Sequence, residues 1–125
     1  MKTHVHTSQS QDDYLEAILK ITNETGFCRS IDLANHLGYA TSSVSIAVGK
    51  LLKAALVERG RAGELLLTEA GRQIAESVLE KHQFFSTWLT SIGVDPEIAE
   101  NDACHMEHAI SDTSFDKLKA HICQS

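Results

Sequence analysis

The stretch from Glu69 to Ile92 constrains the fold more than any other part of the chain. Apolar side chains recur in it every three or four residues, with no proline and a single glycine near its start. This is the spacing of one face of an α-helix, so the stretch predicts one long helix. Such a helix would be roughly 36 Å long, too long and too apolar to serve one small domain alone. It is therefore expected to lead into a second, helical domain. The stripe consists of Ile74, Val78, His82, Phe85, Leu89 and Ile92.

Composition favours a mainly α protein. The chain has 125 residues and is 42% hydrophobic, which suits one compact domain or two small coupled ones. It contains one proline and seven glycines, and such scarcity of helix-breaking residues is typical of helix-rich chains.

The first half of the chain has the pattern of a DNA-reading domain. After a helix expected at 11–24, two shorter helices are predicted at 30–36 and 41–54, the last capped by Thr41 or Ser42. The break between them contains a glycine, and helix, short glycine-containing turn and helix is the helix-turn-helix pattern.

A hairpin is predicted immediately after these helices. Residues 56–59 and 64–67 have the pattern of two short strands, and the residues between them, Gly-Arg-Ala-Gly, form a turn. A helix-turn-helix followed by a hairpin with a basic tip predicts a winged helix. The wing arginines would lie where phosphates can be contacted.

Charge is unevenly distributed along the chain. Residues 1–68 carry seven basic and seven acidic residues, so the net charge of −6 belongs to the remainder. A nucleic-acid surface is therefore expected in the first half, and a cation in the acidic second half. The basic candidates for DNA contact are Lys50 on the reading helix predicted at 41–54, and Arg59 and Arg61 on the wing.

No targeting or membrane-spanning segment is predicted. The longest apolar runs fall well short of the ~18 residues that cross a bilayer, and the N-terminus is too polar for a signal peptide. The three cysteines are far apart and form no CxxC, which favours a reducing, cytoplasmic location.

Residues 101–110, with the sequence NDACHMEHAI, place potential metal ligands close together. If a helix runs from Pro96 to Ser111, Cys104, Glu107 and His108 stand at positions i, i+3 and i+4 of one face. A thiolate, a carboxylate and an imidazole are ligands for transition metals. Two further segments offer ligands, from the first helix and from the long apolar stripe. The candidate ligands are Asp13, Glu16, His82, Cys104, Glu107 and His108.

Each candidate ligand also has a simpler explanation. Asp13 and Glu16 could be favourable charges near a helix start. His82 could be a core histidine with its hydrogen bonds satisfied, and Cys104 a small buried apolar side chain. The coincidence of six candidates favours a site, whereas His105 is expected on the surface. The N-terminal His4 and His6 are given no role.

The quoted motifs resemble the diphtheria-toxin-repressor family of metal-dependent bacterial transcription repressors, which includes manganese-responsive regulators. The resemblance covers nearly the whole chain and is most specific at 92–111. It implies a winged helix joined by a long helix to a helical dimerisation domain, and a homodimer that binds palindromic operator DNA when loaded with metal. The segments that carry it are DDYLEAI (12–18), the helix-turn-helix (30–51), LLLTEAGRQIA (65–75), EKHQFF (80–85) and IGVDPEIAENDACHMEHAIS (92–111).

The resemblance places the family's metal motif on the six candidate ligands. Asp13 and Glu16 match the manganese-responsive branch, whereas Cys104 matches the iron-responsive branch. Ser86 stands where members with an ancillary site have a carboxylate. The DNA-contacting residues that the resemblance adds are those matching the family's hydroxyl-rich helix start, Thr41, Ser42, Ser43 and Ser45. Ile46 stands where the family commonly has Gln or Lys facing bases. The chain is expected to be a short form without the family's SH3-like domain.

We therefore expect a winged-helix DNA-binding domain at 1–70 and a helical metal-binding and dimerisation domain at 71–125. The predicted function is repression of iron or manganese homeostasis genes with Fe(II) or Mn(II) as corepressor, and Co(II), Ni(II) or Zn(II) binding in vitro. The protein is not expected to be an enzyme. Two alternatives remain, a metal-independent winged-helix regulator and, with less support, a metal-dependent hydrolase.

Overall fold

The computed structural model describes residues 9–123, which divide into two compact units between Glu76 and Ser77. His4 and His6 lie outside the described residues. No helix in the described part of the chain combines the length and the hydropathy needed to cross a membrane.

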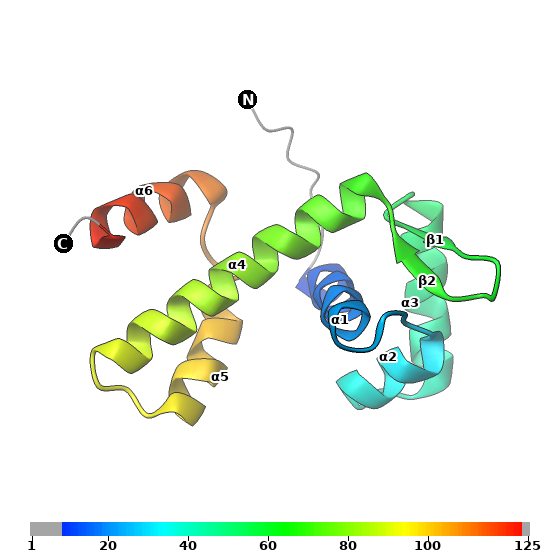
Figure 1. The fold of residues 1–125 in the computed structure, drawn as a ribbon, viewed down its shortest axis with the longest axis horizontal. Helices are drawn as coiled ribbons and strands as arrows, with labels where there is room; N and C mark the ends of the chain where they lie inside the picture. The colour runs from blue at the N-terminus through cyan, green and yellow to red at the C-terminus, as the bar shows by residue number, and fades with distance from the viewer. Residues whose placement is uncertain (1–8, 124–125) are drawn as a thin grey trace. The chain divides into compact units, whose positions relative to one another are not determined.

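Three helices form the body of the first unit (Figure 1). They are α1 (Gln9–Thr25), α2 (Ser30–Leu37) and α3 (Thr41–Lys53), and they pack on one another. Gly38 ends α2 with φ 71°, a left-handed conformation that costs glycine little, and its N–H bonds to the carbonyl of Ala34. The α2–α3 pair therefore has the predicted helix-turn-helix order. The residue before α3 is Ala40, which supplies no side-chain cap, so the capping predicted for Thr41 or Ser42 is wrong.

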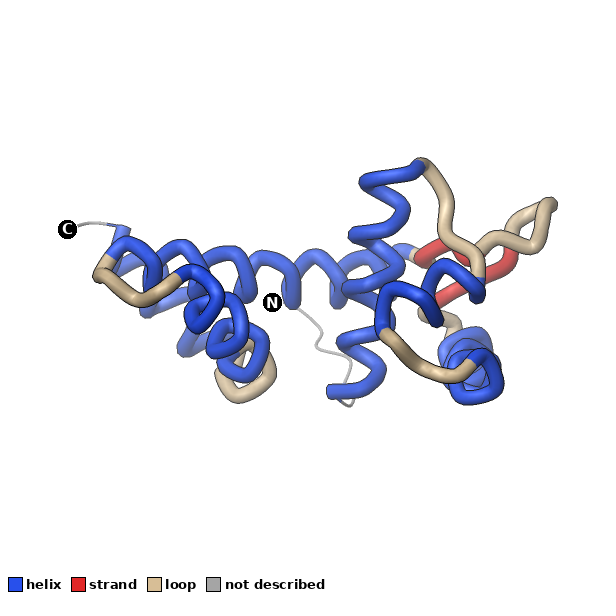
Figure 2. The backbone as a smooth tube through the Cα atoms, turned by 90° about the horizontal axis from the view of Figure 1, so that it is seen from below, coloured by secondary structure: helices blue, strands red, loops and turns tan. Residues whose placement is uncertain are grey.

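A two-stranded antiparallel hairpin follows, and Figure 2 shows it among the helices of the described chain. Strand β1 (Val57–Arg59) pairs with β2 (Leu65–Leu67), Val57 opposite Leu67 and Arg59 opposite Leu65. On its other side β2 is held by a hydrogen bond from the N–H of Leu65 to the carbonyl of Cys28, at 2.7 Å. The wing is thereby fixed to the helical body.

The long helix is α4 (Glu69–Ser91), and its first turn is fastened to the base of the hairpin. The hydroxyl of Thr68 donates to the carbonyl of Ala55 at 2.7 Å and accepts the N–H of Gly71 at 3.2 Å. A Cβ at Gly71 would lie 1.9 Å from the carbonyl oxygen of Leu56. Only glycine allows this approach of helix to backbone.

The second unit contains the rest of α4 with α5 (Pro96–Met106) and α6 (Asp112–Cys123). Asp95 caps α5 by accepting the N–H of Glu97, and Pro96 stands in the first turn as expected. One aromatic cluster joins the three helices, because Phe85 of α4 and Phe115 of α6 pack with Ala103 of α5.

The chain is mainly α, as predicted, but the helix expected at 96–111 is shorter. It ends at Met106, and residues 107–110 form a turn. Ser111 then starts the next helix, because its hydroxyl accepts the N–H of Ser114 at 3.1 Å. Glu107 and His108 consequently lie in the turn after α5 rather than in the middle of a helix.

Candidate metal centre and nucleic-acid interface

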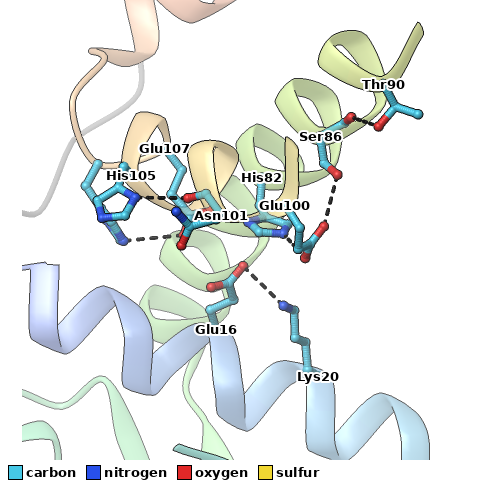
Figure 3. Close-up of polar contacts among 10 residues, drawn as sticks. Glu16, Lys20, His82, Ser86, Thr90, Glu100, Asn101, His105 and Glu107 are labelled. Atoms are coloured by element: carbon cyan, nitrogen blue, oxygen red, sulfur yellow. Dashed lines mark hydrogen bonds and ion pairs between the residues drawn. The ribbon is translucent and has the colours of Figure 1, made fainter. Parts of the chain in front are cut away.

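His82 lies at the middle of a row of polar contacts in the second unit (Figure 3). Its Nε2 atom is 2.5 Å from Oε1 of Glu100, and its Nδ1 atom is 3.2 Å from Oε2 of Glu107. The histidine side chain is 9% exposed. The stripe of α4 therefore brings this imidazole into contact with two carboxylates from the α5 region.

Glu107 is the most deeply buried charged side chain of this group. Its side chain is 0% exposed, and its other oxygen, Oε1, lies 3.3 Å from Nε2 of His108. Although both oxygens approach ring nitrogens, neither accepts a properly aligned hydrogen bond. A buried carboxylate without hydrogen-bond donors is costly, so this arrangement favours a cation beside Glu107.

The electrostatics of His82 agree with that interpretation. The Glu107 carboxylate, and after it the Glu100 carboxylate, raise the pKa of His82 to about 9, although burial of the ring opposes them. The site thus attracts positive charge strongly enough to hold a proton well above neutral pH.

The donor set fits a divalent transition metal. Carboxylate and imidazole are ligands for Mn(II), Fe(II) and Zn(II). The 3.2 and 3.3 Å separations of the Glu107 oxygens from the rings are close to the roughly 3 Å edge expected between ligands of one ion at metal–ligand distances of about 2.1 Å. Within the second unit, Glu107 can therefore share an ion with His82 through Oε2 or with His108 through Oε1.

Asp13 and Glu16 lie on α1, in the first unit, about one turn apart. Glu16 is buried, and its Oε2 atom lies 3.8 Å from Nζ of Lys20, one turn further along the helix. A buried carboxylate differs from the solvated charge that a helix start requires.

The structure does not place Cys104 among the buried ligands. Ala99 and Ala103 form the buried face of α5, so the side chain of residue 104 projects about 100° away from that face. Cys104 is exposed, and among the described residues it is not one of the groups whose donor atoms gather at Glu107. His105 is also exposed, as expected, with Nδ1 bonded to the carbonyl of Asn101 at 2.9 Å.

Glu100 is a residue that sequence reasoning missed. Its second oxygen, Oε2, accepts the hydroxyl of Ser86 at 2.9 Å, while Oε1 contacts His82 (Figure 3). The signal for it was its spacing, since Glu100 precedes Glu107 by seven residues, or about two helical turns.

The residues predicted to contact DNA form two exposed groups in the first unit. Four hydroxyl side chains, with Lys50, project from α3, the second helix of the helix-turn-helix. Ile46 lies among them with 65% of its surface exposed, unusually high for a large apolar side chain. The hydroxyl residues are Thr41, Ser42, Ser43 and Ser45.

The wing carries the second exposed group. Arg59 stands at the end of β1 and Arg61 in the turn, and both are exposed. Nη1 of Arg59 donates to the carbonyl of Gly63 at 3.2 Å, so this arginine also stabilises the tip. Both guanidinium groups lie where a winged helix can meet the phosphate backbone.

These features define a class, a winged-helix regulator with a candidate metal site, and comparison with known proteins identifies the family. Residues 6–63 match the model of the N-terminal DNA-binding domain of iron-dependent repressors. Residues 68–123 match the model of their metal-binding and dimerisation domain. The chain therefore belongs to the iron-dependent repressor family, the metal-dependent transcriptional repressors that include the diphtheria-toxin repressor. The predicted resemblance is confirmed.

Named relatives are transcriptional regulators. The chain is 33% identical to the transcriptional regulator MntR of Escherichia coli O157:H7 over 114 residues, 91% of this chain and 74% of that one. It is 34% identical to the HTH-type transcriptional regulator MntR of Bacillus subtilis (strain 168) over 112 residues, covering 90% and 79%. Because family and relatives are transcriptional regulators, the protein is not an enzyme, and the hydrolase alternative is excluded.

Solved structures confirm the predicted fold class. A manganese-dependent transcriptional repressor in complex with manganese superposes with a TM-score of 0.78 at 26% identity, over 89% of this chain and 51% of that one. The hypothetical protein SSo2273 from Sulfolobus solfataricus superposes at 0.71 and 24% identity, covering 95% and 92%. The chain thus spans about half of the first structure and nearly all of the second.

Proposed function

We propose that this repressor controls iron or manganese homeostasis, with Fe(II) or Mn(II) as its corepressor. The observation that carries the proposal is the fully buried Glu107 carboxylate, which has an imidazole nitrogen near each oxygen and no aligned hydrogen-bond donor. A bound divalent ion supplies the positive charge that this carboxylate lacks.

The proposed ligand set is the one predicted from sequence. Glu107, His82 and His108 are supported by their mutual contacts in the second unit, and Glu16 by its burial. Asp13 and Cys104 rest on the family motif alone. The complete set is Asp13, Glu16, His82, Cys104, Glu107 and His108.

Manganese is favoured by two observations. The buried donors are carboxylates and imidazoles, which suit Mn(II) and Fe(II), and the compared repressor bound manganese and is 26% identical to this chain. The thiolate of Cys104 would shift the preference toward Fe(II), Co(II) or Zn(II) if it became a ligand.

The protein acts on operator DNA as a homodimer, with α3 in the major groove and the wing on the backbone. A two-fold symmetric dimer is matched by a palindromic operator, and the expected location is the cytoplasm. Residues 1–70 read DNA and residues 71–125 bind metal and dimerise. Because the metal is expected to bind the DNA-competent dimer better than the free form, metal affinity and DNA affinity depend on each other.

Operator binding with and without metal tests this proposal. An operator is first selected from random duplexes in the presence of Mn(II). Its affinity is then measured by fluorescence anisotropy at fixed salt, with Mn(II), with Fe(II) under anaerobic conditions and with a chelator. Metal should increase the affinity at least tenfold. Equal affinity in chelator would support the metal-independent alternative instead.

Two variants sharpen the test. Glu107→Gln keeps the shape of the side chain but removes its charge, and it should abolish the metal effect. Its control is Glu80→Gln, which removes an exposed α4 carboxylate paired with Lys119 at 2.8 Å, and this variant should respond to metal normally. Cys104→Ser should change the ranking of Fe(II) over Mn(II), and an unchanged ranking would exclude the thiolate as a ligand.

A further inference from the structure

We infer that Glu100 is a positioning residue of the metal site, which fixes the ring orientation and the protonated nitrogen of His82. The inference rests on the proposed function, because it assumes that His82 binds the ion. Glu100 lies outside the predicted ligand set.

The contacts of His82 divide its two nitrogens between two roles. Nε2 faces Glu100 at 2.5 Å, within hydrogen-bonding distance of the carboxylate oxygen. Nδ1 faces the buried Glu107 oxygen at 3.2 Å without hydrogen-bond alignment. When an ion is bound, Nε2 therefore keeps its proton toward Glu100, and Nδ1 offers its lone pair on the buried side.

Glu100 is itself held in place. Its two oxygens have different partners, His82 on Oε1 and the Ser86 hydroxyl on Oε2 at 2.9 Å, as Figure 3 shows. Ser86 lies four residues after His82 on α4, so both partners of Glu100 project from the same face of one helix. This bidentate contact fixes the carboxylate against α4 and, through it, the plane of the imidazole.

The exposure of the carboxylates separates a ligand from a positioning group. The Glu107 side chain is fully buried, whereas that of Glu100 is 60% exposed. Glu100 can therefore keep its charge in contact with water, while Glu107 depends on a buried cation. A carboxylate that accepts the second N–H of a metal-bound histidine is a common supporting arrangement, and its loss typically weakens metal binding by about 10–100-fold.

Metal affinity measured by calorimetry with Mn(II) gives the first readout. Glu100→Ala should weaken binding by about 10–100-fold. Glu100→Gln should lose less, because its amide oxygen can still accept the Nε2–H, and Ser86→Ala should lose least. The matched control is Glu97→Ala, which removes an exposed carboxylate three residues earlier in α5 and should bind metal normally.

The second readout is specific to the proton on the ring. In Zn(II)-loaded, nitrogen-15-labelled protein, long-range proton–nitrogen spectra should show His82 with a protonated Nε2 and a metal-bound Nδ1. The signal is assigned by its loss in His82→Ala. In Glu100→Ala the Nε2 proton should exchange rapidly with water, and its signal should disappear. An unchanged circular dichroism spectrum of this variant would exclude a general loss of structure as the cause.

The outcomes distinguish this inference from the proposed function. If the wild-type protein binds neither Mn(II) nor Zn(II), the proposed function fails and the inference with it. If the wild type binds but Glu100→Ala matches it in affinity and His82 spectrum, the inference alone is wrong. If Glu100→Ala and Glu100→Gln both abolish binding, Glu100 is a ligand and the positioning role is wrong. Should Glu100→Ala fail to fold, Glu100→Gln and Ser86→Ala decide the question.

Discussion

The two units of the protein bury different kinds of side chain. Among the described residues, sixteen buried apolar side chains lie in the first unit and five in the second. Glu16 is the one buried charged residue described in the first unit, whereas the second has Lys81, His82 and Glu107. The DNA-reading unit is thus built around an apolar core, and the second unit around a small aromatic cluster with charges beside it.

This difference implies different sources of stability. Burial of apolar surface stabilises the first unit without any ligand. In the second unit, three buried charged residues cost free energy unless each is paired. Lys81 has a partner, since its Nζ lies 2.7 Å from Oδ1 of Asp112. Glu107 depends on the neighbouring histidines or on a cation, so the second unit is expected to respond to metal more than the first.

The largest expected effect concerns the aromatic cluster. Phe115→Ala should destabilise the second unit by about 3–5 kcal/mol, because the side chain is buried at the contact of three helices. The only tryptophan, Trp88, packs on this cluster, so its fluorescence reports unfolding of the second unit. The control is Phe27→Ala, a half-exposed phenylalanine of the first unit. If both variants shift the Trp88 transition equally, the units do not differ in the way described.

Metal should sharpen the contrast between the units. Mn(II) at 100 times its dissociation constant should stabilise the site by about 2.7 kcal/mol. Mn(II) should slow hydrogen exchange of the amides in α5 and in the turn around Glu107 more than it slows exchange of the amides in α2 and α3. Glu107→Gln should remove this protection. Equal protection of α2 and α5 by Mn(II) in the wild type would contradict the prediction.

The ion pair of Lys81 allows a smaller test of buried charge. Asp112→Ala should cost about 1–3 kcal/mol, because it leaves the buried ammonium with the Ile110 carbonyl, 3.4 Å away, as its partner among residues 9–123. Lys81→Met should cost less, since it removes the buried charge itself. Asp116→Ala, an exposed carboxylate of the same helix, is the control in chemical unfolding followed by Trp88 fluorescence. A greater loss for Lys81→Met than for Asp112→Ala would contradict this account.

The smallest expected effect concerns the surface of the first unit. Ile46 is exposed and apolar on the reading helix, where it suits a thymine methyl group in the major groove. Replacing one thymine of the selected operator by uracil removes that methyl, worth about 0.8 kcal/mol or fourfold in affinity. In Ile46→Ala, replacement of the contacted thymine by uracil should no longer weaken binding, whereas the same replacement at other thymines should have its wild-type effect. Uniform sensitivity in both proteins would show that Ile46 does not contact the methyl.

Much of the fold could be predicted because periodicity reports which face of a helix is buried. The apolar stripe of α4 predicted that His82 faces inward, and the His82 side chain is buried. The turn chemistry of Gly38 and of the wing was likewise visible in the sequence. The boundary predicted between residues 70 and 71 stays a prediction.

The site was less predictable, since spacing along a helix assumes that the helix continues. Cys104, Glu107 and His108 were expected on one face, but α5 ends at Met106 and the turn separates Glu107, buried, from Cys104, exposed. Ser111 is the sequence signal for this break, because a serine side chain can cap a new helix by accepting the backbone N–H three residues later, here that of Ser114. The spacing of Glu100 from Glu107 indicates a shared helix face, but its contact with His82 follows only from the packing of α5 on α4.

The bond between Leu65 and Cys28 has a consequence for solubility. A two-stranded hairpin normally exposes two open edges that can pair with another molecule. Here the backbone of Cys28 covers part of one edge of the hairpin, at β2. The outer edge is β1, only three residues long and carrying the charges of Glu58 and Arg59. The wing is thereby protected against strand-to-strand aggregation, although it projects two arginines toward a partner.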